Sequence, residues 1–259
     1  MENTVHCICR ATARLAITLT LAGTLSQAAL AQQKILVYTR NYTPDGKGYV
    51  HDNIAASVAA IQKIGAEKGL AVDVSDDPTV FADANLKKYS ALVFSNSNNE
   101  AFATQDQRDA FQRYIRAGGG FVGIHSASGS QRDWPYFWQV LGGKFVVHPV
   151  QQTFKVTVVD SQHVATAGLP AEFDWYDECY FVGNLNAGLH PMLVVDRTKL
   201  HGLEKIEADK FPNPMPLAWW QKFDGGREVY IAIGHNKEEY AKPTMITLIT
   251  NALAFATAR

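Results

Sequence analysis

Three histidines stand where predicted strands end or where a helix begins. His125 follows the apolar run Phe121–Ile124 in GGGFVGIHSASGS, and His235 closes a second apolar run, VYIAIGH. His51 ends the loop after the first predicted strand, just before a helical pattern. The ligand site of a parallel sheet lies at the carboxyl ends of its strands. We therefore expect the three imidazoles to converge at one edge, although each alone could be a hydrogen-bonded, partly buried histidine without chemistry.

Two other segments place polar groups among apolar residues. His148 lies in FVVHPV, where the following proline holds its backbone extended. Asp177 and Glu178 lie inside the aromatic run WYDECYF. A buried carboxylate is costly without a partner, so one of the two should face a site, a cation or solvent. Because side chains alternate along a strand, we expect Asp177 to point outward and Glu178 inward.

Neutral imidazoles beside a carboxylate are suited to two kinds of chemistry. They could bind a divalent metal such as zinc, or they could act as general acid and base. No two histidines have the close spacing His-x-x-x-His, so a metal site depends on the fold to bring its ligands together. The candidate metal ligands are His51, His125, His148, Glu178 and His235. Three other histidines lie in loop-like contexts where we expect no such role: His163, His190 and His201.

Several other residues allow both a functional and a structural interpretation. The aromatic segments WPYFWQVLGGKF and LAWWQKF could stack on sugar faces or could fill the core. Trp134 and Trp219 are the candidate sugar contacts within them. Ser126 would keep the rim of the site small and polar. Cys179 could be a nucleophile or a small buried apolar residue.

The first half of the chain contains the elements that would position these groups. Strand and helix patterns alternate from KILVYTR, which begins at Lys34, to FVGIH, and the strands are nearly continuous apolar runs. This pattern predicts a parallel sheet with helices on both faces. The second half is richer in strands and predicts antiparallel additions, with a hairpin turn at Asp224–Gly226 and a final helix over Pro243–Thr257. The fold class is therefore α/β.

Composition and charge limit the classes of protein to which this chain could belong. The chain has 259 residues, of which 47% are hydrophobic, and a formal net charge of -1. This composition supports a sizeable core, and the charge gives no reason to expect a nucleic-acid or anionic membrane partner. Residues 1–31 combine two arginines, a short apolar run and the small-x-small ending Ala29–Ala31. This combination is typical of a signal peptide without a membrane span, followed by one domain over residues 32–259 in an exported, periplasmic or secreted protein.

Six segments together resemble the trehalose-utilisation (ThuA-like) family: YVHDN, YIRAGGGFVGIHSA, DWPYFWQVLGGKFVVHP, DECYFV, PLAWWQKFDGGREVYIAIGH and EEYAKP. The resemblance implies a class I glutamine amidotransferase-like fold, a flavodoxin-like three-layer α/β sandwich. Amidotransferases carry a nucleophilic cysteine after the strand that here ends in His125, so their chemistry is not expected. The recurrent polar positions of the family fall on His51, His125, His148, Glu178 and His235. This chain departs from the family in HSASGS and at Cys179, where a tryptophan is common.

These observations leave two main hypotheses. The first is an enzyme that acts on glycosides or 3-keto-glycosides, such as trehalose-like disaccharides, by hydrolysis, elimination or isomerisation. His125, His235 and Glu178 would then be acid/base groups or metal ligands, with His51 and His148 in support at the substrate. The alternative is a non-catalytic sugar-binding or interaction module of the cell envelope. Thiol chemistry at Cys179 is a third and weaker idea.

Overall fold

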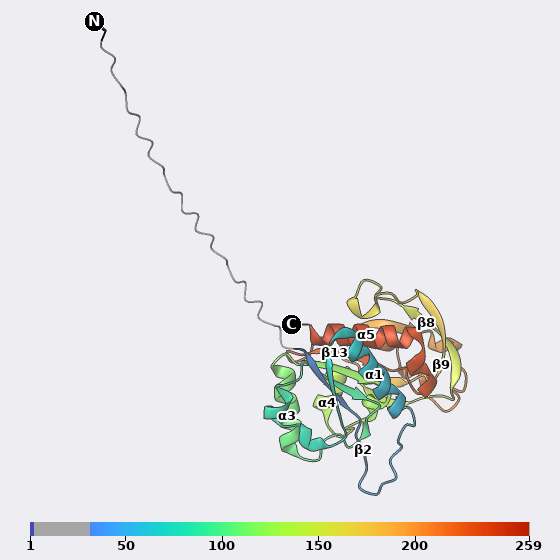
Figure 1. Ribbon diagram of the computed structural model, residues 1–259. Coiled ribbons are helices and arrows are strands. Elements are labelled where there is room, and N and C mark those ends of the chain that lie inside the picture. The colour runs from blue at the N-terminus through green and yellow to red at the C-terminus, as the bar shows by residue number, and fades with distance from the viewer. Residues whose placement is uncertain (3–31, 259) are drawn as a thin grey trace. The chain divides into compact units, whose positions relative to one another are not determined.

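The computed structural model of this protein describes residues 1–2 and 32–258, so residues 3–31 of the predicted signal peptide lie outside the described residues. The folded unit from Gln32 onward is built around one nine-stranded sheet (Figure 1). Five strands pair in parallel, in the order β3 (Ala71–Ser75), β1 (Lys34–Tyr38), β4 (Ala91–Ser95), β6 (Gly120–Ile124) and β13 (Arg227–Ile231). Four antiparallel strands extend it, in the order β12 (Met215–Gln221), β11 (His190–Val195), β8 (Gln152–Val158) and β9 (Glu172–Asp177).

Shorter elements complete the unit. Two small sheets pair β2 (Asn41–Tyr42) with β5 (Asn98–Asn99), and β7 (Lys144–Val147) with β10 (Phe181–Gly183). The helices are α1 (Ile54–Lys68), α2 (Asp83–Leu86), α3 (Gln105–Arg116), α4 (Pro135–Leu141) and α5 (Pro243–Thr257). Single 3₁₀ turns cover Pro78–Val80, His125–Gly129, Val164–Thr166, Arg197–Lys199, Ala208–Lys210 and Lys237–Ala241.

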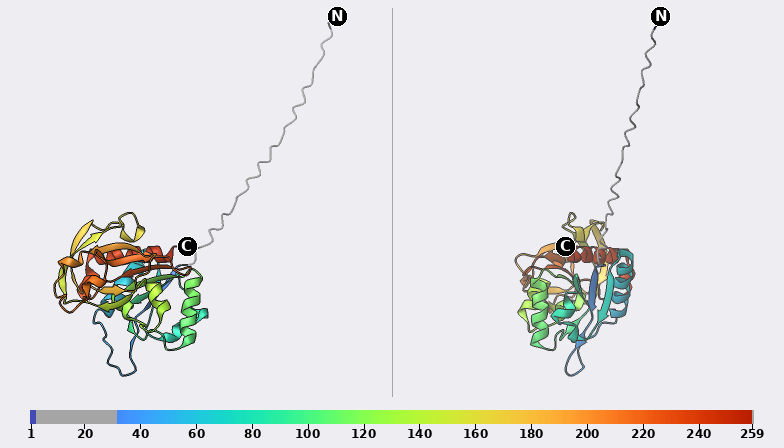
Figure 2. Two further views of the ribbon diagram at one scale, coloured as in Figure 1. Left: turned by 180° about the vertical axis from the view of Figure 1, so that it is seen from behind. Right: turned by 60° about the vertical axis from the view of Figure 1, so that its left-hand side comes forward.

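Helices cover both faces of the parallel half, and strands β1, β4, β6 and β13 each contribute to both cores. In β1, Ile35 and Val37 pack with α1 and α5, whereas Leu36 and Tyr38 pack in the second core with α3 and α4. Figure 2 shows α1 and α3 on opposite sides of the sheet. This double coverage is why the central strands β1, β4 and β6 are nearly continuous apolar runs instead of alternating. The predicted three-layer α/β fold with antiparallel additions is confirmed.

The sequence signals at helix and hairpin ends act as expected. The side chain of Thr104 caps α3 by accepting the backbone N–H of Gln107, whose own side chain bonds back to the N-cap. Strands β12 and β13 form the predicted antiparallel hairpin around Asp224–Gly226, and α5 has the predicted bounds. Among the described residues, no helix has both the length and the apolar character needed to cross a membrane.

Candidate functional site

His125 lies at a sharp turn where β6 passes into a 3₁₀ helix. Its φ is +49°, a left-handed conformation that few residues other than glycine adopt. The hydroxyl of Tyr230 donates to the carbonyl oxygen of His125 (2.8 Å) and also contacts the hydroxyl of Ser128 (2.7 Å), which fixes this turn. The turn directs a fully buried imidazole across the end of the sheet. Such unusual backbone conformations occur preferentially at functional sites.

His235 follows β13, and its backbone is held by two buried side chains. Asp177 accepts hydrogen bonds from the backbone N–H groups of Gly234 (2.7 Å) and His235 (3.3 Å). The amide of Asn53, the residue that precedes α1, donates to the carbonyl oxygens of the same two residues. Because Asn53 also follows His51 by two positions, it ties the loop that carries His51 to the loop that carries His235.

The prediction that Asp177 points outward is wrong. Its side chain is completely buried, and it also accepts hydrogen bonds from the indole of Trp175 and the backbone N–H of Glu178. Burial raises the pKa of Asp177 to about 6, against the opposing effect of these N–H donors. Four N–H donors supply the partners that a buried carboxylate needs. The expected inward direction of Glu178 agrees with its small exposure, 9%, and its place in the wall of the cavity.

Four of the candidate ligands come together at this edge. One ligand atom from each of His51, His125, Glu178 and His235 lies within 4.8 Å of all the others. The Nε2 atoms of His51 and His125 are 3.2 Å apart, and Nδ1 of His235 is 3.1 Å from Oε2 of Glu178. Two ligands on a tetrahedral zinc ion are roughly 3.3 Å apart, given its usual bond lengths. The spacing of these pairs therefore fits a shared divalent ion.

The protonation of the histidines also suits metal binding. Nδ1 of His125 donates to the carbonyl oxygen of Ala232 (2.8 Å), so the lone pair of the neutral ring lies on Nε2. Burial and the neighbouring His51 hold the pKa of His125 well below its usual value. Burial and the neighbouring His235 lower the pKa of His51 to about 4. Both rings are therefore neutral at pH 7, as metal-binding imidazoles must be.

Glu178 joins the buried cluster to the more exposed His148. Burial acts to raise the pKa of Glu178, but the hydrogen-bonding contact with His235 and the charges of His148 and His235 lower it overall. Conversely, burial acts to lower the pKa of His235, and Glu178 raises it. Nδ1 of His235 nevertheless lies in an orientation that makes no well-formed hydrogen bond. Nε2 of His148 is 3.5 Å from Oε1 of Glu178, so His148 lies beside the four-residue cluster, outside it.

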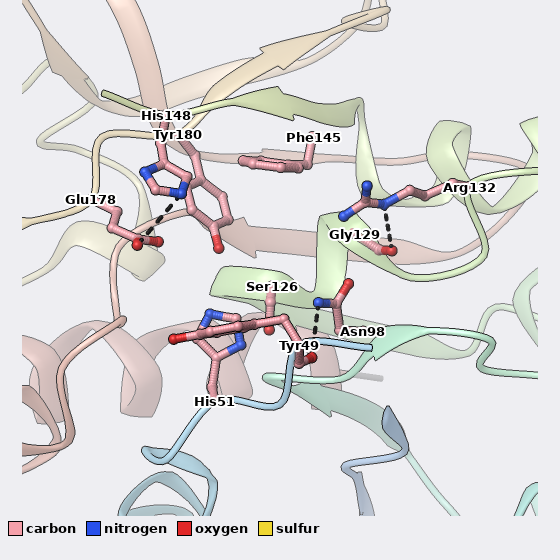
Figure 3. A pocket seen from close by; sticks show the side chains of 10 residues that line it. All are labelled: Tyr49, His51, Asn98, Ser126, Gly129, Arg132, Phe145, His148, Glu178 and Tyr180. Carbon is pink, nitrogen blue, oxygen red and sulfur yellow. Dashed lines mark hydrogen bonds and ion pairs between the residues drawn. The ribbon is translucent and has the colours of Figure 1, made fainter. Parts of the chain in front are cut away.

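Two residues of the cluster, His51 and Glu178, line a cavity of about 340 Å³ (Figure 3). This volume lies in the range of small-molecule sites. Tyr180 also lines the cavity, and its hydroxyl donates to Nε2 of His125 (2.9 Å). Burial and the charge of Glu178 hold its pKa well above the usual value, so the phenol stays protonated. Sequence reasoning missed Tyr180, although its place two residues after Glu178 on an extended segment was a usable signal. The cavity is lined by Tyr49, His51, Asn98, Ser126, Gly129, Arg132, Phe145, His148, Glu178 and Tyr180.

Of the three other predicted substrate contacts, Ser126, Trp134 and Trp219, only Ser126 lines the cavity. Ser126 lines the cavity with a buried hydroxyl that has no protein partner among the described residues. Trp219 is 1% exposed and donates its indole N–H to the carbonyl oxygen of Leu141, so it is a core residue, which corrects the expected sugar contact. Trp134 is half-buried against Phe102 and does not line the cavity, so it too lies away from the expected contact.

Cys179 takes the structural role that the sequence also allowed. The thiol is completely buried in the core that contains α1 and α5. Burial, together with the nearby Asp177 carboxylate, raises its pKa far above the usual range. Because the thiolate is the nucleophilic form, a thiol held protonated and out of contact with solvent is inert. Its neighbours in the chain, Glu178 and Tyr180, face the cavity instead.

Comparison with known proteins gives the family. Residues 34–256 match the model of the ThuA family, described as trehalose utilisation. Similar solved structures include a ThuA-like protein from Bacteroides uniformis (24% identity, TM-score 0.70, covering 88% of this chain and 93% of that one) and one from Parabacteroides merdae (16%, 0.66, 87% and 90%). A GMP synthase subunit from Thermoplasma acidophilum shares the fold (14%, 0.52, 87% and 94%). No curated protein matches. The chain belongs to the ThuA family, on a glutamine amidotransferase-like fold.

Proposed function

We propose that this protein is an exported enzyme that acts on glycosides or 3-keto-glycosides, such as trehalose-like disaccharides, by hydrolysis, elimination or isomerisation. The family supports a role in carbohydrate use. The observation that carries the proposal is the convergence of three histidines and one glutamate, two of which, His51 and Glu178, line a cavity large enough for a sugar. Export to the periplasm or the medium rests on the signal-peptide pattern of residues 1–31.

The cluster is suited to hold a divalent cation such as zinc. Its ligands would be His51, His125, His235 and Glu178. Each of the three imidazoles has one ring nitrogen that faces the cluster. The carbonyl of Ala232 accepts the other ring N–H of His125 and so fixes its orientation, as such carbonyls do for metal-binding histidines. A bound ion would supply Lewis-acid chemistry, polarising a carbonyl or hydroxyl oxygen of the sugar.

The residues around the cluster are suited to move protons. A keto group on a sugar acidifies the neighbouring C–H bonds, so a base placed beside it could remove that proton. His148 lies at the cavity with its Nε2 near Glu178, and an imidazole can both accept and donate a proton. With an ion on Nε2 of His125, the protonated hydroxyl of Tyr180 would no longer donate to that nitrogen and could donate to a substrate oxygen on which negative charge develops.

A substrate panel tests the proposal directly. The purified protein would be incubated with disaccharides and their 3-keto derivatives, with and without a chelator, and the products identified by mass spectrometry. We expect product that disappears with chelator and returns when zinc is added. Product that is indifferent to chelator would refute the metal and leave the histidines as acid/base groups. Sugar binding without any product would favour the non-catalytic module.

Metal binding has its own test, independent of turnover. Bound zinc would be measured by elemental analysis after equilibrium dialysis of the wild type, His51→Ala and His201→Ala. Loss of one ligand should lower zinc affinity by at least about tenfold. His201 is an exposed histidine outside the cluster, so its variant should bind as the wild type does. Equal zinc affinity in all three proteins would exclude the cluster as the metal site.

A further inference from the structure

Arg132 presents a fixed guanidinium to the cavity, at the end opposite to Glu178 (Figure 3). Its Nε donates to the carbonyl oxygen of Gly129 (3.0 Å), and its guanidinium carbon lies 5.5 Å from the centre of the Phe145 ring. A backbone acceptor and an aromatic face thus hold the group from two sides. An arginine held in this way loses little side-chain entropy when it binds a ligand.

The charge of Arg132 has no partner among the described residues. Its two terminal nitrogens donate to no group there, and no carboxylate lies within ion-pair distance. The neighbouring carboxylates are already paired, Asp133 with Arg108 (3.1 Å) and Glu100 with Arg40 (3.4 Å). Arg132 therefore keeps a free, forked donor set, which is the geometry that carboxylates and phosphates accept.

Two groups near Arg132, the ammonium of Lys144 and the hydroxyl of Ser126, also favour an anionic ligand. The ammonium of Lys144 donates to the backbone carbonyl of Arg132 (3.0 Å) and forms no ion pair within the described part of the chain, so a second positive charge lies nearby. The hydroxyl of Ser126 lines the same cavity, is 2% exposed and lacks a protein partner there. A buried hydroxyl without a partner is costly, which a ligand hydrogen bond would relieve.

We infer that the cavity binds a sugar that carries an anionic group, a carboxylate or a phosphate, and that Arg132 pairs with this group. The sugar ring would then extend past Ser126 toward Glu178 and the histidine cluster. This inference rests on the proposal that the cavity is a sugar site, and it narrows the substrate class. A neutral disaccharide would leave the fork of Arg132 without a charged partner at the cavity.

Calorimetry with matched sugars tests the inference without requiring turnover. Methyl β-D-glucuronide carries a carboxylate at C6 where methyl β-D-glucoside carries a hydroxymethyl group, and glucose 6-phosphate differs from glucose only in a phosphate. We expect the wild type to bind at least one anionic sugar about tenfold more tightly than its neutral partner, as a charge-assisted fork contact allows. The pair with the larger preference identifies carboxylate or phosphate. The preference should shrink as sodium chloride is raised.

Two variants assign the preference to its residue. Arg132→Gln should reduce the preference to less than about twofold, whereas Arg108→Gln, which alters a paired arginine outside the cavity, should retain it. An equal preference in Arg132→Gln and the wild type, or no preference in the wild type, would overturn the inference. Binding of no sugar at all would overturn it together with the proposed function. Selective binding of an anionic sugar with no turnover of any substrate would uphold it while the enzyme proposal fails.

Discussion

Glu228 makes a pH-dependent contribution to stability that the structure allows to be calculated. It lies near the start of β13, at the end of the strand away from the histidine cluster, and is 1% exposed. Oε2 accepts the backbone N–H of Phe223 (2.9 Å), and Oε1 has no partner within the described chain. Burial raises its pKa from 4.5 to about 8, against the opposing effect of that N–H group. The folded protein therefore holds this carboxyl protonated at neutral pH.

The sign and size of the effect follow from linkage. Between pH 4.5 and about 8 the folded chain keeps a proton that the unfolded chain has released. The free energy of unfolding consequently falls as pH rises through this window. The full shift corresponds to about 5 kcal/mol as an upper limit, of which about 2 kcal/mol is lost between pH 6 and pH 8.

Glu228→Gln tests this calculation, because glutamine has nearly the size of the protonated acid and does not titrate. Urea unfolding of the wild type and the variant at pH 6, 7 and 8 would give the difference in unfolding free energy at each pH. From pH 6 to pH 8, we expect the unfolding free energy of the variant to rise by about 2 kcal/mol relative to that of the wild type. Glu67→Gln, on the exposed face of α1, is the matched control and should show no such trend. A difference that stays constant with pH for Glu228→Gln would refute the reasoning.

Two further predictions concern packing and the site. A Cβ added at Gly120 would overlap the backbone carbonyl of Ala256 in α5, so Gly120→Ala should lower stability by about 2 kcal/mol or more in urea unfolding. Gly188→Ala, where the added carbon meets nothing within 4 Å, should change little, and similar losses in both variants would contradict the packing argument. Tyr180→Phe should lower kcat about a hundredfold while zinc affinity stays within a few-fold of the wild type. Unchanged kcat would remove Tyr180 from the proton-donor role.

The location of the candidate site at the carboxyl edge of the sheet was predictable, because the ends of the strands can be recognised in the sequence. Continuous apolar runs identified β6 and β13, and the topology of a parallel sheet then placed His125 and His235 at the same edge. The placement of His51 at this edge followed from its position between a strand and a helix. The distances between the candidate ligand atoms were not predictable, because they depend on loop contacts such as the bonds from Asn53 to the His235 loop.

The errors came from assigning side chains to the wrong face of a strand or to the wrong environment. Asp177 is the last residue of β9 and lies on the same buried face as Trp175, where it accepts backbone N–H groups from a loop distant in sequence. Trp219 lies on β12, which is buried along nearly its whole length, so aromatic character alone could not separate a core residue from a ligand contact. Arg132 was not singled out because an arginine in a polar loop carries no local sign that its charge lacks a partner.

The position of β13 also determines the order in which the site can be assembled. It is the last strand in the chain, yet it lies inside the sheet between β6 and β12. Until it is inserted, these two strands expose unpaired edges, and His235 cannot reach His51 and His125. A chain that ends before β13 would thus lack both a closed sheet and a full ligand set. Completing the central sheet and completing the ligand set require the same strand, so binding at the cluster reports that β13 is in place.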